Sequence, residues 1–90
     1  MTYDYQHERP KLFTEEGQVM FLKIRDRTRS LLKTSGAARA DKMTAGVTGL
    51  SWTMQACLDR MVELEEIREV SPPGTWGQYR IFTVFDVRDV

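Results

Sequence analysis

The sequence lacks most of the residues from which active sites and metal centres are built. Its 90 residues include one cysteine, Cys57, and one histidine, His7, so neither a disulfide framework nor a cysteine–histidine metal set can form within the chain. It contains no glycine-rich phosphate loop and no nucleophile, base and carboxylate at the spacing of a catalytic motif. We therefore predict that the protein is not an enzyme and that it binds no metal and no cofactor.

A net charge and a long hydrophobic run are also missing. Thirteen Lys and Arg balance thirteen Asp and Glu, which leaves no bulk attraction to nucleic acid or to an anionic membrane. The charges are unevenly spread, because residues 1–50 hold nine basic and six acidic side chains and residues 51–90 hold four and seven. No apolar run approaches the length of a membrane span, and the first residues lack the pattern of a signal peptide. We expect a cytoplasmic protein that does not enter a membrane.

The chain is short enough for one domain with a single small core. Residues 1–13 are polar, carry scattered aromatic side chains and include Pro10, so they predict an arm rather than a packed element. Residues 14–90 are predicted to form the domain. Thr14 and the two glutamates after it mark a helix start, and this helix should cover residues 15–33. Its apolar stripe consists of Phe21, Ile24, Thr28, Leu31 and Leu32.

Val19 and Leu22 lie on a second side of this helix, away from the stripe. Because they would be exposed in a lone domain, we predict that they meet the N-terminal arm, the C-terminal strand or a second copy of the chain. A homodimer through Val19, Leu22 or the C-terminal strand follows from this pattern. The basic side chains of the same helix form either a solvated face or a face that contacts phosphates.

A short helix and a tight turn are predicted next. Gly36 suits the left-handed end of the first helix, and Ser35 is expected to cap an Ala-rich helix over residues 37–47. Gly49 should supply the positive φ of the turn, and Leu50 should fill the corner.

The stretch from residue 51 to residue 79 predicts a third helix that continues directly into a β-hairpin. Ser51 is expected to cap a helix over residues 51–65. The apolar side of this helix consists of Met54, Cys57, Leu58, Met61 and Leu64, with Glu65 beside them. Its outward side consists of Trp52, Thr53, Gln55, Ala56, Asp59, Arg60 and Glu63.

Two segments after this helix have the composition and alternation of strands. Residues 67–70 and 79–87 should pair antiparallel around the turn sequence SPPGTWGQ, in which glycines allow the chain to reverse. Arg80, Phe82 and Val84 should face one way, and Ile81 and Thr83 the other. Together the elements predict an α+β winged helix-turn-helix, with three helices followed by a two- or three-stranded antiparallel β wing.

The segment AGVTGLSWTMQACLDRMVELEEIREVSPPGTWGQYRIFTV resembles the helix-turn-helix and wing of small DNA-binding regulators of the MarR and IclR kind. The matching features are TGLS at the turn, CLDRMVELEEIREV from the recognition helix into the first wing strand, and GQYRIF in the returning strand. The resemblance covers roughly residues 37–85. This chain departs from the pattern at Glu65, where a glycine usually joins the helix to the first strand.

The resemblance implies a small transcriptional regulator that binds double-stranded DNA sequence-specifically, with the helix at about residues 51–65 in the major groove. Gln55 suits bidentate recognition of adenine, and Arg60 suits a phosphate. The groove-entering residues map onto Ser51, Trp52, Thr53, Gln55 and Ala56, and the wing tip onto residues 75–78, which include Trp76. Arg39, Lys42, Arg68 and Arg80 are the expected backbone contacts at the edges.

The same sequence also supports a protein-protein interaction module without DNA binding on the winged-helix scaffold. The wing tip has no Lys or Arg, although phosphate neutralisation supplies much of the affinity for DNA. Trp52 and Trp76 are aromatic anchors with few charges beside them, which is typical of protein interfaces. Each tryptophan also has a structural alternative, Trp52 as a staple on the preceding turn and Trp76 as a lid over the wing.

Overall fold

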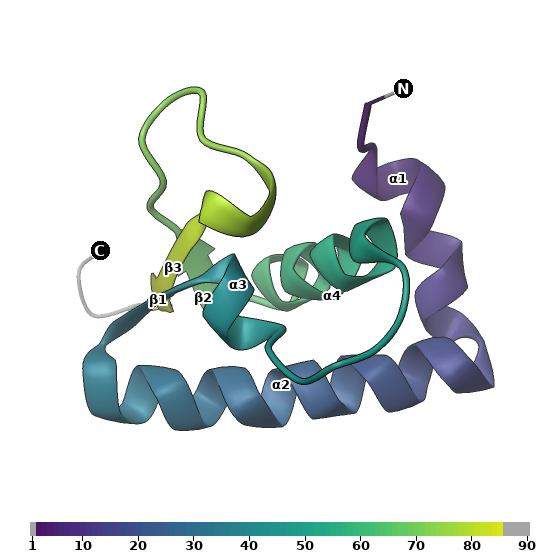
Figure 1. The fold of residues 1–90 in the computed structure, drawn as a ribbon, viewed down its shortest axis with the longest axis horizontal. Helices are drawn as coiled ribbons and strands as arrows, with labels where there is room; N and C mark the ends of the chain where they lie inside the picture. Colours follow the sequence, from purple (N-terminus) through teal and green to yellow (C-terminus); the bar gives the residue numbers. More distant parts are fainter. Residues whose placement is uncertain (1, 86–90) are drawn as a thin grey trace.

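Helix α2 (Glu15–Ser35) runs along one side of the molecule, and the other elements pack on the opposite side (Figure 1). The structure is a computed structural model that describes residues 2–85. The remaining elements are α1 (Tyr5–Glu8), η1 (Arg9–Phe13), β1 (Ala37–Arg39), α3 (Ala40–Met43), α4 (Ser51–Glu63), β2 (Ile67–Glu69), η2 (Gly77–Tyr79) and β3 (Ile81–Val84), where η denotes a 3₁₀-helix.

Helix α2 begins and packs as the sequence predicts. The Thr14 side chain accepts a hydrogen bond from the Gly17 N–H, which satisfies one of the unpaired amides of the first turn. Gly36 ends the helix with a φ of 77°, the left-handed conformation that glycine adopts at low cost. The predicted stripe is confirmed, because Phe21, Ile24, Thr28 and Leu32 are buried and Leu31 packs against the core.

The three strands form an antiparallel sheet in the order β1-β3-β2. Pairing of β2 with β3 confirms the predicted hairpin, in which Ile67 lies opposite Val84 and Glu69 opposite Phe82. The loop between β2 and η2 projects from the sheet on the side away from α2 (Figure 1). Strand β3 is shorter at both ends than the predicted strand over residues 79–87, since Tyr79 belongs to η2 and neither Arg80 nor Phe85 is in the strand. The last two predicted residues lie outside the described chain.

The helix predicted over residues 37–47 is largely wrong. Ala37–Arg39 form strand β1, and only Ala40–Met43 form a helix, α3. Ser35 is the last residue of α2 rather than a cap for the next element. Because Gly36 reverses the chain beside the open edge of β3, ladder hydrogen bonds outweigh the helical preference of the two alanines.

The turn before α4 also differs from the prediction. Gly49 has the expected positive φ, 146°, but Leu50 is 71% exposed and does not fill the corner. The Met20 side chain from α2 fills the corner instead. Its methyl carbon is so close to Gly49 that a Cβ added to this glycine would lie 2.2 Å from it. Ser51 is the first helical residue, and Leu50 stands at the cap position without a side-chain hydrogen bond.

Helix α4 is buried over a wider arc than the sequence predicts. Cys57, Leu58 and Met61 are fully buried, which confirms the centre of the predicted apolar side, but Leu64 is 41% exposed. Thr53 and Ala56, expected on the outward side, are buried. The reason is that α4 contacts α2, α1, η1 and β2, so neighbours surround it on several sides.

The junction between α4 and β2 shows what replaces the usual glycine. Glu65 adopts a positive φ of 59°, a conformation that costs a non-glycine residue roughly 1 kcal/mol. Its N–H donates to the Val62 carbonyl, and the Glu66 N–H donates to the Met61 carbonyl. These two bonds form a Schellman end, so the chain makes the glycine-type corner without a glycine.

The N-terminal residues are not the unpacked arm that the sequence predicts. They form α1 and η1, which contact α4 and, for η1, α2. Leu12 is 1% exposed and joins the core, and Glu8 is 2% exposed. Pro10 stands at the start of η1, where its missing N–H has no helical partner to lose.

The described chain is therefore α+β, with a three-stranded antiparallel sheet at one end of a set of helices, an arrangement compatible with a winged helix. No helix within residues 2–85 combines the length and apolar character needed to cross a membrane. The core consists of Leu12, Phe21, Ile24, Leu32, Ala40, Met43, Ala56, Cys57, Leu58, Met61, Ile67 and Phe82.

Substituting Gly17 tests the packing of the N-terminal residues on α2. A Cβ there would lie 2.1 Å from the Lys11 carbonyl oxygen, so we expect Gly17→Ala to destabilise the protein by about 1–3 kcal/mol in urea unfolding. Ser30→Ala, at an exposed position of the same helix, should change the stability by less than about 0.5 kcal/mol. A stabilised Gly17→Ala variant, as helix propensity alone predicts, would show that η1 does not pack here.

Candidate functional site

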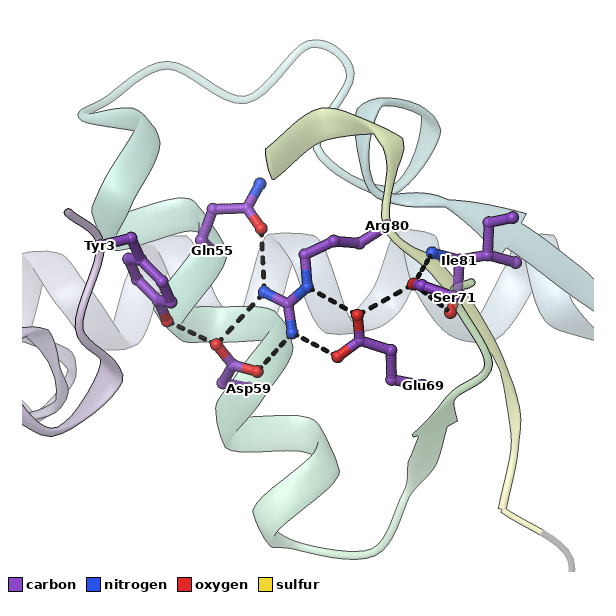
Figure 2. A network of polar contacts seen from close by, with 7 residues as sticks. All are labelled: Tyr3, Gln55, Asp59, Glu69, Ser71, Arg80 and Ile81. Carbon is purple, nitrogen blue, oxygen red and sulfur yellow. Dashed lines mark hydrogen bonds and ion pairs between the residues drawn. The ribbon is translucent and has the colours of Figure 1, made fainter. Parts of the chain in front are cut away.

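The candidate site lies where α4 meets the base of the wing, and its centre is the side chain of Arg80. This residue connects η2 to β3 and is only 8% exposed. Its guanidinium donates to Asp59 at 2.6 Å, to Glu69 at 2.8 and 3.0 Å, and to the Gln55 amide oxygen at 3.1 Å (Figure 2). One buried cation thus joins α4 to strand β2 through three acceptors.

The secondary structure places these acceptors around Arg80. Gln55 and Asp59 are four residues apart on α4, so they lie on one helical face. Glu69 reaches the same guanidinium from β2, the neighbour of β3 in the sheet. The Arg80 carbonyl accepts a hydrogen bond from the Ala40 N–H, which fixes the backbone of Arg80 at the junction of β1 and α3.

Two further residues extend the network in opposite directions. The Tyr3 hydroxyl donates to Asp59 at 2.5 Å, and the Ser71 hydroxyl donates to Glu69 at 2.9 Å. Ser71 also accepts from the Ile81 N–H at 2.7 Å, so the network ends on the backbone of β3 (Figure 2). We call Tyr3, Gln55, Asp59, Glu69, Ser71 and Arg80 the Arg80 cluster.

The electrostatics of the Arg80 cluster favour a structural role over proton transfer. Burial alone would lower the pKa of Arg80, but the hydrogen bonds and charges of Glu69 and Asp59 outweigh burial and raise that pKa. The bonds from Arg80 lower the pKa of Glu69 against the opposing effect of burial. Burial and the bond to Asp59 raise the pKa of Tyr3. At neutral pH Arg80 and Glu69 are therefore charged and Tyr3 is protonated, so none of the three is poised to exchange a proton.

A second polar group covers the C-terminal half of α4. Glu63 accepts from Tyr5 at 2.7 Å, from Arg9 at 3.0 Å and from Arg60 at 2.8 Å. These bonds, with Tyr5 the largest contributor, lower the pKa of Glu63 to about 2. The Phe13 ring lies 5.0 Å from the Arg9 guanidinium and 5.2 Å from that of Arg60. The outer surface of α4 from its middle to its end is therefore occupied by residues of the N-terminal segment.

Six of the eleven residues predicted by name to contact DNA are engaged within the fold. Thr53 is 7% exposed and Ala56 is fully buried, while Gln55 belongs to the Arg80 cluster. Each of the other three, all arginines, pairs with an acidic side chain: Arg39 with Asp41, Arg60 with Glu63, and Arg80 with Asp59 and Glu69.

The other five predicted contacts are accessible but differ in kind. Lys42, Arg68 and Ser51 are exposed, and Trp52 is partly buried near the start of α4. Trp76 is 80% exposed, so it does not form a lid over the wing. The accessible predicted contacts are therefore two cations, one hydroxyl and two aromatic side chains.

Sequence reasoning missed Tyr3, Asp59, Glu69 and Ser71 as members of one cluster. The alternation of β3 contained a usable signal, because it places Arg80 on the same side as Phe82, which is fully buried. A cation beside a core residue needs acidic partners, and Asp59 and Glu69 were the nearest candidates along the adjoining elements.

The remaining chemistry of the described residues is limited. Burial raises the pKa of the Cys57 thiol to about 12, so this thiol is not a nucleophile at neutral pH. Within residues 2–85 no three His, Cys, Asp or Glu side chains are grouped so that they could hold a metal ion.

Comparisons of the chain with models of protein families, with curated proteins and with solved structures find no match. The resemblance to DNA-binding regulators therefore stays a prediction from the sequence motifs.

Removing Arg80 should weaken the join between α4 and the wing. We expect Arg80→Met to destabilise the protein by about 3 kcal/mol in urea unfolding, because Asp59 and Glu69 would lose their partner. Arg68→Met removes an exposed arginine from the adjoining strand and should cost less than about 0.5 kcal/mol. Equal losses in the two variants would show that the Arg80 cluster contributes no specific stability.

Acid should weaken the wild-type protein through the same cluster. A carboxyl whose pKa is lower in the folded state stabilises the fold above its unfolded pKa, near 4.5 for Glu69, and loses this contribution as the pH falls. Glu69→Gln should therefore show a shallower decline of urea midpoint than wild type between about pH 5 and pH 3. Parallel declines would contradict the pKa assignment.

Proposed function

We propose that the protein is an interaction module on a winged-helix scaffold, whose wing loop inserts into an apolar pocket of a partner protein. The observation that carries this proposal is the chemistry of residues 70–79, called here the docking loop. These ten residues contain no charged side chain, and Trp76 within them is 80% exposed.

The order of elements supports the scaffold. Helix α2, strand β1, helices α3 and α4 and strands β2 and β3 follow one another, with β3 between β1 and β2 in the sheet. Helix α4 continues into the wing through the Glu65 corner. This order is compatible with the winged-helix pattern, with α3 reduced to a single turn.

The engagement of α4 gives a DNA-reading role less support than the sequence did. A recognition helix needs free side chains that reach base edges and cations that reach phosphates. Gln55 instead accepts from Arg80, and the acidic residues Asp59 and Glu63 follow it along the helix. Sequence-specific binding of double-stranded DNA by a transcriptional regulator stays a prediction, and it is one outcome of the test below.

The absence of charge in the docking loop indicates which class of partner it binds. Without cations it offers no phosphate neutralisation and no attraction to anionic lipid. An exposed indole is the side chain most enriched at the centres of protein interfaces, where it fills an apolar pocket. Tyr79 at 56% and Val70 at 44% exposure add apolar surface at the two ends of the loop.

Local bonds hold the loop in shape before any partner binds. The Thr75 N–H donates to the Pro72 carbonyl, and the Arg39 guanidinium lies 5.7 Å from the Tyr79 ring. Pro72 and Pro73 restrict the backbone further. Such preorganisation lowers the entropy that binding must overcome, which suits a loop that presents an anchor residue.

Self-association through α2 is a separate prediction. Val19 and Leu22 are each 50% exposed, so the described elements leave both half uncovered. Two half-exposed apolar side chains are common on the surface of a monomer, so their exposure alone does not indicate a dimer.

The test of the docking loop uses peptides selected from a random displayed library on the whole chain. We expect the selected peptides to be apolar and to lose at least about tenfold in affinity with Trp76→Ala, because a hot-spot anchor is removed. Val19→Ala removes a half-exposed apolar side chain elsewhere and should leave the affinity unchanged. Unfolding curves should place both variants within about 0.5 kcal/mol of wild type.

Two parallel titrations test the other partner classes, which are DNA and lipid. Random duplex DNA at low salt and vesicles with anionic lipid should show no binding to the wild-type chain. Duplex binding that falls steeply with salt would favour the DNA reading, and vesicle binding that depends on Trp76 would favour a lipid surface. Selected peptides that bind equally well to Trp76→Ala would also overturn the proposal.

A further inference from the structure

The N-terminal residues consist of an anchored part and a peripheral part. Residues 8–13 are anchored, because Glu8 and Leu12 are buried and the Lys11 carbonyl lies against Gly17. Residues 2–7, called here the strap, lie at the surface, and only the two tyrosines among them are partly buried. The side-chain bonds from the strap to α4 are those of the Tyr3 and Tyr5 hydroxyls.

The two tyrosines make the same kind of bond but belong to different networks. Tyr3 donates to Asp59, which also binds Arg80, and Arg80 binds Glu69. Tyr5 donates to Glu63, whose other partners, Arg9 and Arg60, make no hydrogen bond with the Arg80 cluster within the described residues. The structure therefore connects one tyrosine to the wing and leaves the other as a natural control.

The connection through Tyr3 reaches both ends of the docking loop. Glu69 accepts from Ser71, where the loop begins, and Arg80 lies where the loop returns to β3. Ser71 and Ile81 close the base of the loop, since the Ile81 N–H donates to Ser71 (Figure 2) and the Val70 N–H donates to the Ile81 carbonyl.

We infer that the strap regulates the docking loop by controlling how Arg80 is shared between Asp59 and Glu69. While the Tyr3 hydroxyl occupies Asp59, the guanidinium is divided between α4 and β2. When the strap leaves α4, Asp59 loses a donor and draws Arg80 toward itself, which weakens the bonds to Glu69 and loosens the base of the loop. Any chain that captures the strap thus changes the loop from a distance.

This inference concerns the loop of the proposed function, and its experiment first measures the loop without a partner. Tyr3→Phe and Tyr5→Phe each remove one hydroxyl from a tyrosine–carboxylate bond on α4. Amide hydrogen exchange by NMR should show the Ile81 N–H about fivefold faster in Tyr3→Phe, the effect of losing one hydrogen bond. The Ile81 N–H of Tyr5→Phe should exchange at the wild-type rate.

An amide in α2, such as that of Ile24, reports global unfolding. Faster exchange at both Ile24 and Ile81 in Tyr3→Phe would mean general destabilisation and would overturn the inference. Equal rates at Ile81 in wild type and Tyr3→Phe, or equal acceleration in the two variants, would overturn it as well.

The peptides selected with Trp76 give the second measurement. Tyr3→Phe should weaken their binding about fivefold, because a looser loop is less preorganised, and Tyr5→Phe should not. Peptides that depend on Trp76 but bind Tyr3→Phe normally would reject the regulation and leave the proposed function intact. Faster Ile81 exchange without any Trp76-dependent peptide would reject the function while supporting the connection between strap and loop.

Discussion

The sharing of one buried guanidinium between two carboxylates is the constraint on which the wing depends. An arginine below one-tenth exposure must have its charge compensated, and Asp59 and Glu69 do this from α4 and β2. The planar fork donates two bonds to each carboxylate and one to Gln55, five bonds in all, whereas a lysine has only three donors. Since the Arg80 carbonyl also binds Ala40, a single residue fixes the sheet relative to α3 and α4.

The parts of the fold that could be predicted are those with local causes. The Thr14 cap, the stripe of α2 and the glycine at its end depend on neighbouring residues in the chain, and all three are confirmed. Strand β1 was missed because its alanines favour helix, and only the open edge of β3, more than forty residues later, makes them a strand. The packing of the N-terminal residues was missed because Pro10 suggests a break in structure, whereas it stands at the start of η1 and leads to the buried Leu12.

The candidate site was harder to predict than the fold. Helical periodicity predicts which way a side chain points, but it does not predict which other elements pack against that side of the helix. It correctly placed Cys57 and Met61 inward, but it could not show that α1, η1 and the wing would surround α4. Thr53 and Ala56 therefore appeared free although both are buried. Asp59 and Glu63 are predicted only to face outward, yet each binds at least two residues from other parts of the chain.

The outer surface of α4 and the wing differ in which side chains are free to bind a partner. Along the outer surface of α4 the hydroxyls and cations of the N-terminal residues meet the acidic groups, so a nucleic acid would have to displace them and would then face carboxylates. The wing differs, because Trp76 is 80% exposed and the docking loop that carries it contains no charged residue. A partner that does not need α4 and that binds an exposed, uncharged tryptophan is a protein with an apolar surface. Binding of such a surface to the docking loop would alter the environment of Arg80, because this residue pairs both with Glu69 at the base of the loop and with Asp59 in the middle of α4.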